Sequence, residues 1–145
     1  MTTSNTIRVT TIPAIRYANA DKAIDWLKQA LGFTAKAVYR DNNGVVVHAE
    51  LLRGNGMVMI GTCGQNKETA QWFVQPNAAG GVTASVYLIV PECEPVYATA
   101  KAAGAEILQE LQAKDYGGNA FIVRDPEGQI WSIGEYNPWS TESSK

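Results

Sequence analysis

The sequence of 145 residues has an ordinary globular composition, with 46% hydrophobic residues, 18% charged residues and a formal net charge of −2. Lys and Arg are scattered with no basic run, which argues against nucleic acid as a partner. No apolar run reaches the roughly 20 residues that cross a bilayer, and the N-terminus lacks the features of a secretory signal. We therefore expect a cytoplasmic protein with no membrane partner.

The first strongly periodic segment runs from Asn19 to Gly32. Ile24, Leu27 and Leu31 recur at a helical spacing, which predicts an amphipathic helix near residues 20–31. Asn19 suits the N-cap, and Gly32 can adopt the left-handed conformation that ends a helix.

Segments rich in β-branched residues and bounded by turn clusters surround this helix. The predicted strands of the first half are residues 7–17, 35–40, 45–53 and 57–62. The second half has the same order, with a helix near 94–103 and strands at 82–90, 107–111, 119–124 and 129–136. Each half therefore reads as a βαβββ module.

Two pairs of glycines support a duplication. Gly32 and Gly104 lie 72 positions apart, and so do Gly56 and Gly128. The alternative is two unrelated halves that share turn glycines. We expect a single domain, residues 1–145, made of modules 7–62 and 82–136 and joined by a polar linker, 63–81. Trp72 in this linker could cover a ligand, form a subunit contact or pack on the core.

The strand at 45–53 contains the one histidine of the chain, His48. Alternation along the strand separates a uniformly apolar set, residues 45, 47, 49 and 51, from a set that contains His48 and Glu50. We expect the apolar set to pack on the helices and the His48–Glu50 pair to face the other way. The pair could bind a polar ligand, transfer a proton, contribute to a metal site or be a plain surface pair.

The two cysteines, Cys63 and Cys93, have neither a CxxC spacing nor neighbouring histidines. They are expected to be reduced, and they do not indicate zinc.

Two stretches carry a family pattern: IRYANADKAIDWLKQALGF (15–33), and AKAAGAEI (100–107) followed by RDPEGQIWSIGEY (124–136). They resemble the first strand and helix, and the DPxG hairpin and last strand, of the vicinal oxygen chelate superfamily. That superfamily includes glyoxalases, bleomycin resistance proteins and extradiol dioxygenases. The resemblance covers residues 7–136 and implies an α+β fold of tandem βαβββ modules, a curled mixed sheet that forms a cup, and a homodimer.

In the metal-using members of this family, each module supplies one ligand from its first strand and one from its fourth. Those positions fall here at Ile12, Ile60, Ser85 and Ser132, and none is a good metal ligand. The chain therefore resembles the metal-free binding members more than the metalloenzymes.

The register implied by the resemblance also turns Arg16 and Tyr87 into the cup. An Arg in an apolar pocket needs an anion, from Glu50 or from an acidic ligand, although Arg16 could instead reach solvent. Ser85, Tyr87 and Ser132 would offer neutral hydrogen-bonding groups, with plain packing as the alternative for each.

We expect a metal-free protein, without cofactor, that binds or sequesters a small aromatic or antibiotic-like compound. The candidate ligand contacts are Arg16, His48, Glu50, Trp72, Ser85, Tyr87 and Ser132. The alternative is a glyoxalase-like lyase or isomerase, or a dioxygenase, that uses His48 and Glu50 or a relocated metal site. A third hypothesis is a dimer with a regulatory role.

Overall fold

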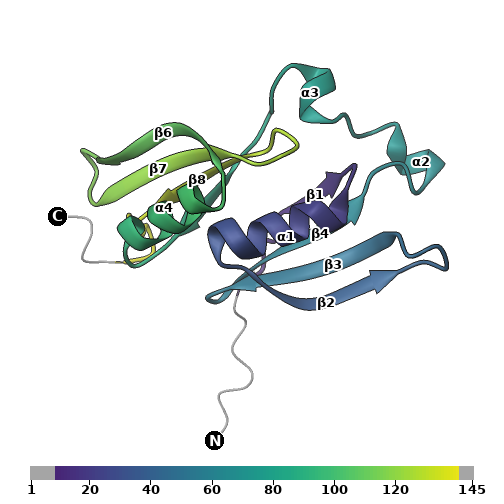
Figure 1. Cartoon of the computed structure of the whole chain (residues 1–145), viewed down its shortest axis with the longest axis horizontal. Helices are drawn as coiled ribbons and strands as arrows, with labels where there is room; N and C mark the ends of the chain where they lie inside the picture. Colours follow the sequence, from purple (N-terminus) through teal and green to yellow (C-terminus); the bar gives the residue numbers. More distant parts are fainter. Residues whose placement is uncertain (1–8, 141–145) are drawn as a thin grey trace, which may run out of the picture. The chain divides into compact units, whose positions relative to one another are not determined.

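The computed structural model describes residues 9–140 (Figure 1). The first two residues of the predicted first module, Ile7 and Arg8, lie outside the described residues. In chain order, the elements of the first half are β1 (Ala14–Tyr17), α1 (Ala20–Leu31), β2 (Thr34–Arg40), β3 (Val46–Arg53), β4 (Gly56–Thr62) and the short α2 (Lys67–Ala70). Those of the second half are the short α3 (Pro76–Ala79), β5 (Val86–Ile89), α4 (Cys93–Ala102), β6 (Glu106–Ala113), β7 (Asn119–Arg124) and β8 (Ile130–Gly134).

The two halves form separate sheets with the same topology. The strand orders are β1-β4-β3-β2 and β5-β8-β7-β6. In each sheet the first pair, β1 with β4 or β5 with β8, is parallel and the other pairs are antiparallel. The predicted pair of βαβββ modules in an α+β fold is confirmed. Over the described residues, the chain divides into two compact units, one of residues 9–28 and 32–73 and the other of 29–31 and 74–140.

Helix α1 begins and ends where the sequence predicts. The Asn19 side chain accepts a hydrogen bond from the Lys22 amide at 3.0 Å. Gly32 has φ 79°, and its amide donates to the Lys28 carbonyl at 3.2 Å. The cap residue and the left-handed glycine satisfy backbone groups that a helix end leaves without partners, which fixes both boundaries.

The first strand of each module is shorter than predicted. β1 begins at Ala14 rather than residue 7, and β5 begins at Val86 rather than residue 82. Pro13 explains the first case, because it has no amide hydrogen to donate to a sheet ladder. Its carbonyl still accepts from the Met59 amide at 2.9 Å, so the pairing with β4 begins there.

The DPEG hairpin between β7 and β8 is a five-residue loop organised by Asp125. One oxygen of Asp125 accepts from the amides of Glu127 at 3.0 Å and Gln129 at 2.9 Å. The other accepts from the buried indole of Trp131 at 3.2 Å. Gly128, with φ 98°, supplies the left-handed turn that this loop requires.

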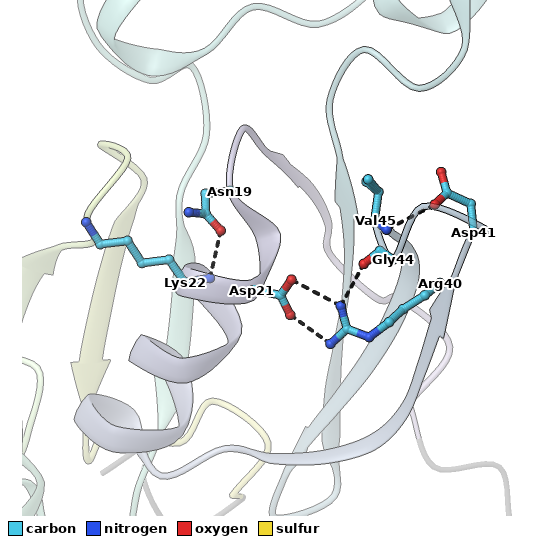
Figure 2. Close-up of polar contacts among 7 residues, drawn as sticks. All are labelled: Asn19, Asp21, Lys22, Arg40, Asp41, Gly44 and Val45. Atoms are coloured by element: carbon cyan, nitrogen blue, oxygen red, sulfur yellow. Dashed lines mark hydrogen bonds and ion pairs between the residues drawn. The ribbon is translucent and has the colours of Figure 1, made fainter.

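The same loop occurs between β2 and β3, where the sequence is DNNG. One oxygen of Asp41 accepts from the amides of Asn43 at 2.8 Å and Val45 at 3.0 Å, and Gly44 has φ 83°. Figure 2 shows the Asp41–Val45 contact beside Arg40. The loop chemistry is therefore repeated, but in non-equivalent hairpins of the two modules.

The predicted match of Gly56 with Gly128 is consequently wrong. Gly56 is the first residue of β4, pairs with Arg53 and is not among the glycines with positive φ. The turn glycine of this tighter hairpin is Gly54, with φ 60°. The equal spacing of the two glycines is a coincidence of loop lengths.

Arg40, at the end of β2, ties the first hairpin to the first turn of α1 (Figure 2). Its guanidinium donates to both oxygens of Asp21, at 2.8 and 3.1 Å, and to the Gly44 carbonyl at 3.0 Å. This guanidinium lowers the pKa of Asp21. The paired hydrogen bonds hold the helix to the edge strand of the sheet.

Candidate functional site

The first sheet has one buried face and one open face. We call the buried face the one that carries the following side chains, all at most 3% exposed: Tyr17, Ala49, Leu51, Val58 and Ile60. Alternation along each strand sends the intervening residues to the opposite side. We call that side the open face, with the following members: Ala14, Arg16, Ala37, Tyr39, His48, Glu50, Met57, Met59 and Gly61.

His48 and Glu50 lie on the open face, as the alternation predicts. The prediction for the start of this strand is wrong, because Val46 is 1% exposed and Val47 is 44% exposed. The register with β2 shifts there, since Tyr39 pairs with His48 while Arg40 pairs with Val46. This bulge reverses the inward and outward order for the residues before His48.

The His48 imidazole and the Glu50 carboxylate are hydrogen-bonded, with 3.0 Å between Nε2 and Oε2. The side chains are 39% and 23% exposed, so both remain accessible to a solute. The other Glu50 oxygen accepts from the Lys36 ammonium at 3.4 Å. The hydrogen bond from His48, and secondarily the Lys36 contact, lower the pKa of Glu50. The pair is thus a carboxylate held beside an imidazole, an arrangement that can bind a polar group or accept a proton.

Tyr39 covers one side of His48. The two rings are stacked, with centroids 6.0 Å apart and an interplanar angle of 21°. Tyr39 lies directly opposite His48 on β2, and it is an exposed aromatic. The stacking and the Glu50 hydrogen bond together restrict the orientation of the imidazole.

Arg16 contacts the segment that follows β4. Its guanidinium carbon lies 4.4 Å from the centre of the Phe73 ring, and Nη1 donates to the Thr69 hydroxyl at 3.4 Å. The contact with Phe73 is a cation–π interaction. Trp72, the aromatic residue selected from the sequence, is 65% exposed, whereas its neighbour Phe73 makes the contact.

The candidates of the second module are arranged differently. Tyr87 pairs with Ser132 across β5 and β8, so these two share a face of the second sheet. The Tyr87 hydroxyl donates to the Tyr136 carbonyl at 2.7 Å. Its ring lies over Gly134, where a Cβ would be 2.8 Å from a ring carbon. Ser85 precedes β5 and is exposed.

The metal-ligand positions that the resemblance assigns need one correction. Ile60 pairs with Ile15 and is 1% exposed on the buried face, so the open-face residues of β4 are its neighbours Met59 and Gly61. The corresponding residues of the first strand are Ala14 and Arg16. None of these supplies a carboxylate, imidazole or thiolate, and the set does not fit a divalent metal ion.

Within residues 9–140, no group of three or more His, Cys, Asp or Glu side chains is placed to hold a metal ion. Over the same residues, no helix is both long and apolar enough to span a membrane.

Four residues contact the candidate side chains Arg16, His48 and Glu50 but are not predicted from the sequence. They are Lys36, Tyr39, Thr69 and Phe73. Tyr39 could have been found, since it lies two residues before a turn cluster on a strand that pairs with the His48 strand. Lys36 lies at a register shift of β2, and Thr69 and Phe73 lie in the linker, where alternation makes no prediction.

Two mycobacterial proteins are similar in sequence to most of this chain. An uncharacterized protein of Mycobacterium tuberculosis is 26% identical over 128 residues, which are 85% of this chain and 72% of that protein. An uncharacterized protein of Mycobacterium bovis is also 26% identical over 128 residues, which are 85% of this chain and 80% of that protein.

Among solved structures, TioX from Micromonospora sp. ML1 has a TM-score of 0.69 and 28% identity, over 92% of this chain and all of that chain. A glyoxalase I variant from Zea mays has a TM-score of 0.66 and 13% identity, over 85% of this chain and 43% of that one, which shows the fold alone.

A family model covers nearly the whole described chain. It matches residues 8–133, which include both modules, the linker and the DPEG hairpin. Its span agrees with the two sheets of identical topology and with the fold of the solved relatives. The chain belongs to the Glyoxalase/Bleomycin resistance protein/Dioxygenase superfamily.

Proposed function

We propose that this protein binds a small organic molecule on the open face of the first sheet, and that it does so without a metal ion. The observation that carries the proposal is the hydrogen bond of 3.0 Å between His48 and Glu50, both partly accessible, on that face. The opposite face of the sheet is buried, and strands of a packed sheet hold binding groups more precisely than loops do.

The chemistry of the open face suits an aromatic ligand. Tyr39, Met57 and Met59 offer aromatic and polarisable surfaces, and His48, Glu50 and Arg16 offer a few polar groups. Ligand sites of small molecules typically combine these two kinds of group. The family includes both enzymes and resistance proteins, so its fold does not choose between binding and catalysis. An antibiotic-like compound fits the proposal.

The second sheet contributes less to this proposal. The Tyr87 hydroxyl already donates its hydrogen to the Tyr136 carbonyl. The other candidate hydrogen-bonding groups of the second sheet are Ser85 and Ser132. We therefore place the polar contacts with ligand chiefly on Arg16, His48 and Glu50.

Methionine methyl labelling tests the proposal, because Met57 and Met59 both lie on the open face. We expect members of a panel of bicyclic aromatic compounds to shift the Met59 methyl resonance. His48→Ala should weaken that binding by about 1–3 kcal/mol, the cost of leaving a polar partner without its contact. Lys28→Ala, on the exposed side of α1, is the control and should not change it. Failure of every compound to shift Met59 would refute the proposal, as would a bound metal ion that survives dialysis and is lost in His48→Ala.

The second candidate is a metal-independent lyase or isomerase, and the His48–Glu50 hydrogen bond also favours it. Glu50 orients the imidazole through this hydrogen bond, as the partner of a general base does. Turnover of a bound carbonyl compound that is lost in both His48→Gln and Glu50→Gln, while binding persists, would establish this activity instead of simple sequestration.

A further inference from the structure

The two ring nitrogens of His48 have different surroundings. Nε2 lies 3.0 Å from Glu50 Oε2 and is hydrogen-bonded to it. Nδ1 has no hydrogen-bond partner among residues 9–140. The two nitrogens point in different directions from the ring, so a group that contacts Nδ1 does not compete with Glu50. The side chain is 39% exposed, which leaves room for a ligand beside the ring.

The hydrogen bond with Glu50 decides which nitrogen carries the hydrogen of the neutral ring. An ionised carboxylate only accepts hydrogen bonds. Glu50 is ionised at neutral pH, because the contacts with His48 and then with Lys36 lower its pKa further below neutrality. Nε2 is therefore the donor in this contact. In a neutral imidazole with its hydrogen on Nε2, Nδ1 has no hydrogen and is an acceptor.

The neighbours of the imidazole hold it in this orientation. Tyr39 stacks on one face of the ring, and Lys36 donates to the second oxygen of Glu50 at 3.4 Å. Both oxygens of the carboxylate thus have a donor, and the imidazole is held at one edge and on one face. The acceptor nitrogen consequently has a fixed direction on the open face.

An acceptor nitrogen selects ligands by the hydrogens that they can donate. A hydroxyl or N–H group can hydrogen-bond to Nδ1, whereas a carboxylate or carbonyl oxygen has no hydrogen to offer it. The surface beside the pair suits an aromatic ring, since Tyr39 lies opposite His48 and Met59 lies opposite Glu50. A phenol combines an aromatic ring with a strong neutral donor.

We propose that Nδ1 of His48 accepts a hydrogen bond from the hydroxyl of a phenolic ligand, and that Glu50 is the positioning residue that keeps this nitrogen an acceptor. This inference rests on the proposed function, to which it adds the chemical class of the ligand. It also gives Glu50 a role that is exerted through His48, whether or not the carboxylate contacts the ligand itself.

The hydrogen on the ring can be located directly, because His48 is the one histidine of the chain. Nitrogen NMR of the untagged full chain with isotope-labelled histidine gives one pair of ring signals. Nε2 is recognised by its couplings to both carbon-bound ring hydrogens. At a pH above the titration of the imidazole, Nε2 should have the shift of a nitrogen that carries hydrogen, and Nδ1 that of a nitrogen without one.

Variants at position 50 test the positioning role. Glu50→Leu removes the acceptor, so the ring should exchange between its two neutral forms and the two nitrogen signals should move towards each other. Glu50→Gln keeps an acceptor oxygen of the same reach, and its signals should lie between those of the other two proteins. Glu110→Leu is the matched control, because Glu110 is an exposed carboxylate on a strand of the other unit. It should leave the His48 signals unchanged.

The ligand class is tested with 2-naphthol and 2-methoxynaphthalene, which share a ring system, although only the naphthol has a hydrogen to donate. Dissociation constants are measured from the Met59 methyl shift. We expect the naphthol to bind about tenfold more tightly, as one added hydrogen bond allows. It should also shift the Nδ1 signal more than the Nε2 signal. In His48→Phe, which keeps a ring beside Tyr39, the ratio of affinities should fall close to one.

The outcomes separate this inference from the proposed function. A hydrogen on Nδ1 in the unaltered protein, or unchanged ring signals in Glu50→Leu, would overturn the inference. Equal affinity for the two compounds, or no binding of the naphthol at millimolar concentration, would do the same. The location of the hydrogen and the affinity ratio are both measured in the unaltered protein, so the test does not depend on the folding of a variant. The proposed function has its separate test in the wider panel, where any compound that shifts Met59 supports it.

Discussion

At the scale of single residues, the charge of Glu50 depends on its two neighbours. The His48 contact is 3.0 Å long and the Lys36 contact 3.4 Å, and both stabilise the ionised carboxylate. A lowered pKa means that the stabilisation is present above the pKa of the unfolded chain and is lost as the pH falls through the lower folded value.

This difference in contact length predicts unequal effects of two substitutions. His48→Phe keeps a ring that can stack on Tyr39 but removes the hydrogen bond, so the pKa of Glu50 should rise towards its ordinary value. Lys36→Met should raise it less. Carbon NMR of the Glu50 carboxyl during a pH titration measures both shifts. A larger rise in Lys36→Met than in His48→Phe would contradict the assigned order of the two interactions.

At the scale of elements, the DPEG motif that points to the family has a structural role. Asp125 is buried and accepts hydrogen bonds from two loop amides and from the indole of Trp131. The motif therefore fixes the hairpin that aligns β8 with β7, and it lies outside the candidate ligand contacts. Asp41 accepts the equivalent two amide hydrogen bonds in the β2–β3 hairpin. Those two donors do not include an indole.

The two loops allow a matched comparison of stability. Asp125→Ala should lower the free energy of unfolding by about 2–3 kcal/mol, because it leaves a buried indole and loop amides without their acceptor. Asp41→Ala should cost about 1 kcal/mol, since its amides are closer to solvent. Chemical denaturation followed by circular dichroism measures both. Equal losses in the two variants would show that the Trp131 contact contributes nothing.

At the scale of the whole molecule, the chain consists of two units of the same topology and still exposes large apolar side chains. Trp72, Val74 and Trp139 are each at least 65% exposed. Such side chains on a protein surface often mark contacts with another molecule. Resemblance to the family, whose cups are usually completed across a subunit boundary, points to a second copy of this chain.

We therefore expect a homodimer. Light scattering at micromolar concentration should give twice the mass of one chain. Trp139→Ser together with Trp72→Ser should shift the protein towards the monomer if these residues lie in the contact, with no change in far-ultraviolet circular dichroism. A mass of one chain for the unaltered protein would remove the prediction.

The sequence by itself determined the elements and their order. Hydrophobic periodicity and cap residues fixed α1 at residues 20–31, and turn clusters separated the strands of two βαβββ modules. Alternation also placed His48 and Glu50 on the same face. These features depend on interactions between residues that are close in the sequence, so the sequence pattern alone predicts them.

Only the tertiary structure decided which residues meet across strands. The bulge that exposes Val47, the contact of Arg16 with Phe73 and the pairing of Arg16 with Gly61 all follow from register and from loop paths. A shift of one residue in a strand reverses the face of every side chain beyond it, so Ile60 was assigned to the wrong side. The candidate site therefore depends on pairing between distant segments, which periodicity along a single strand does not encode.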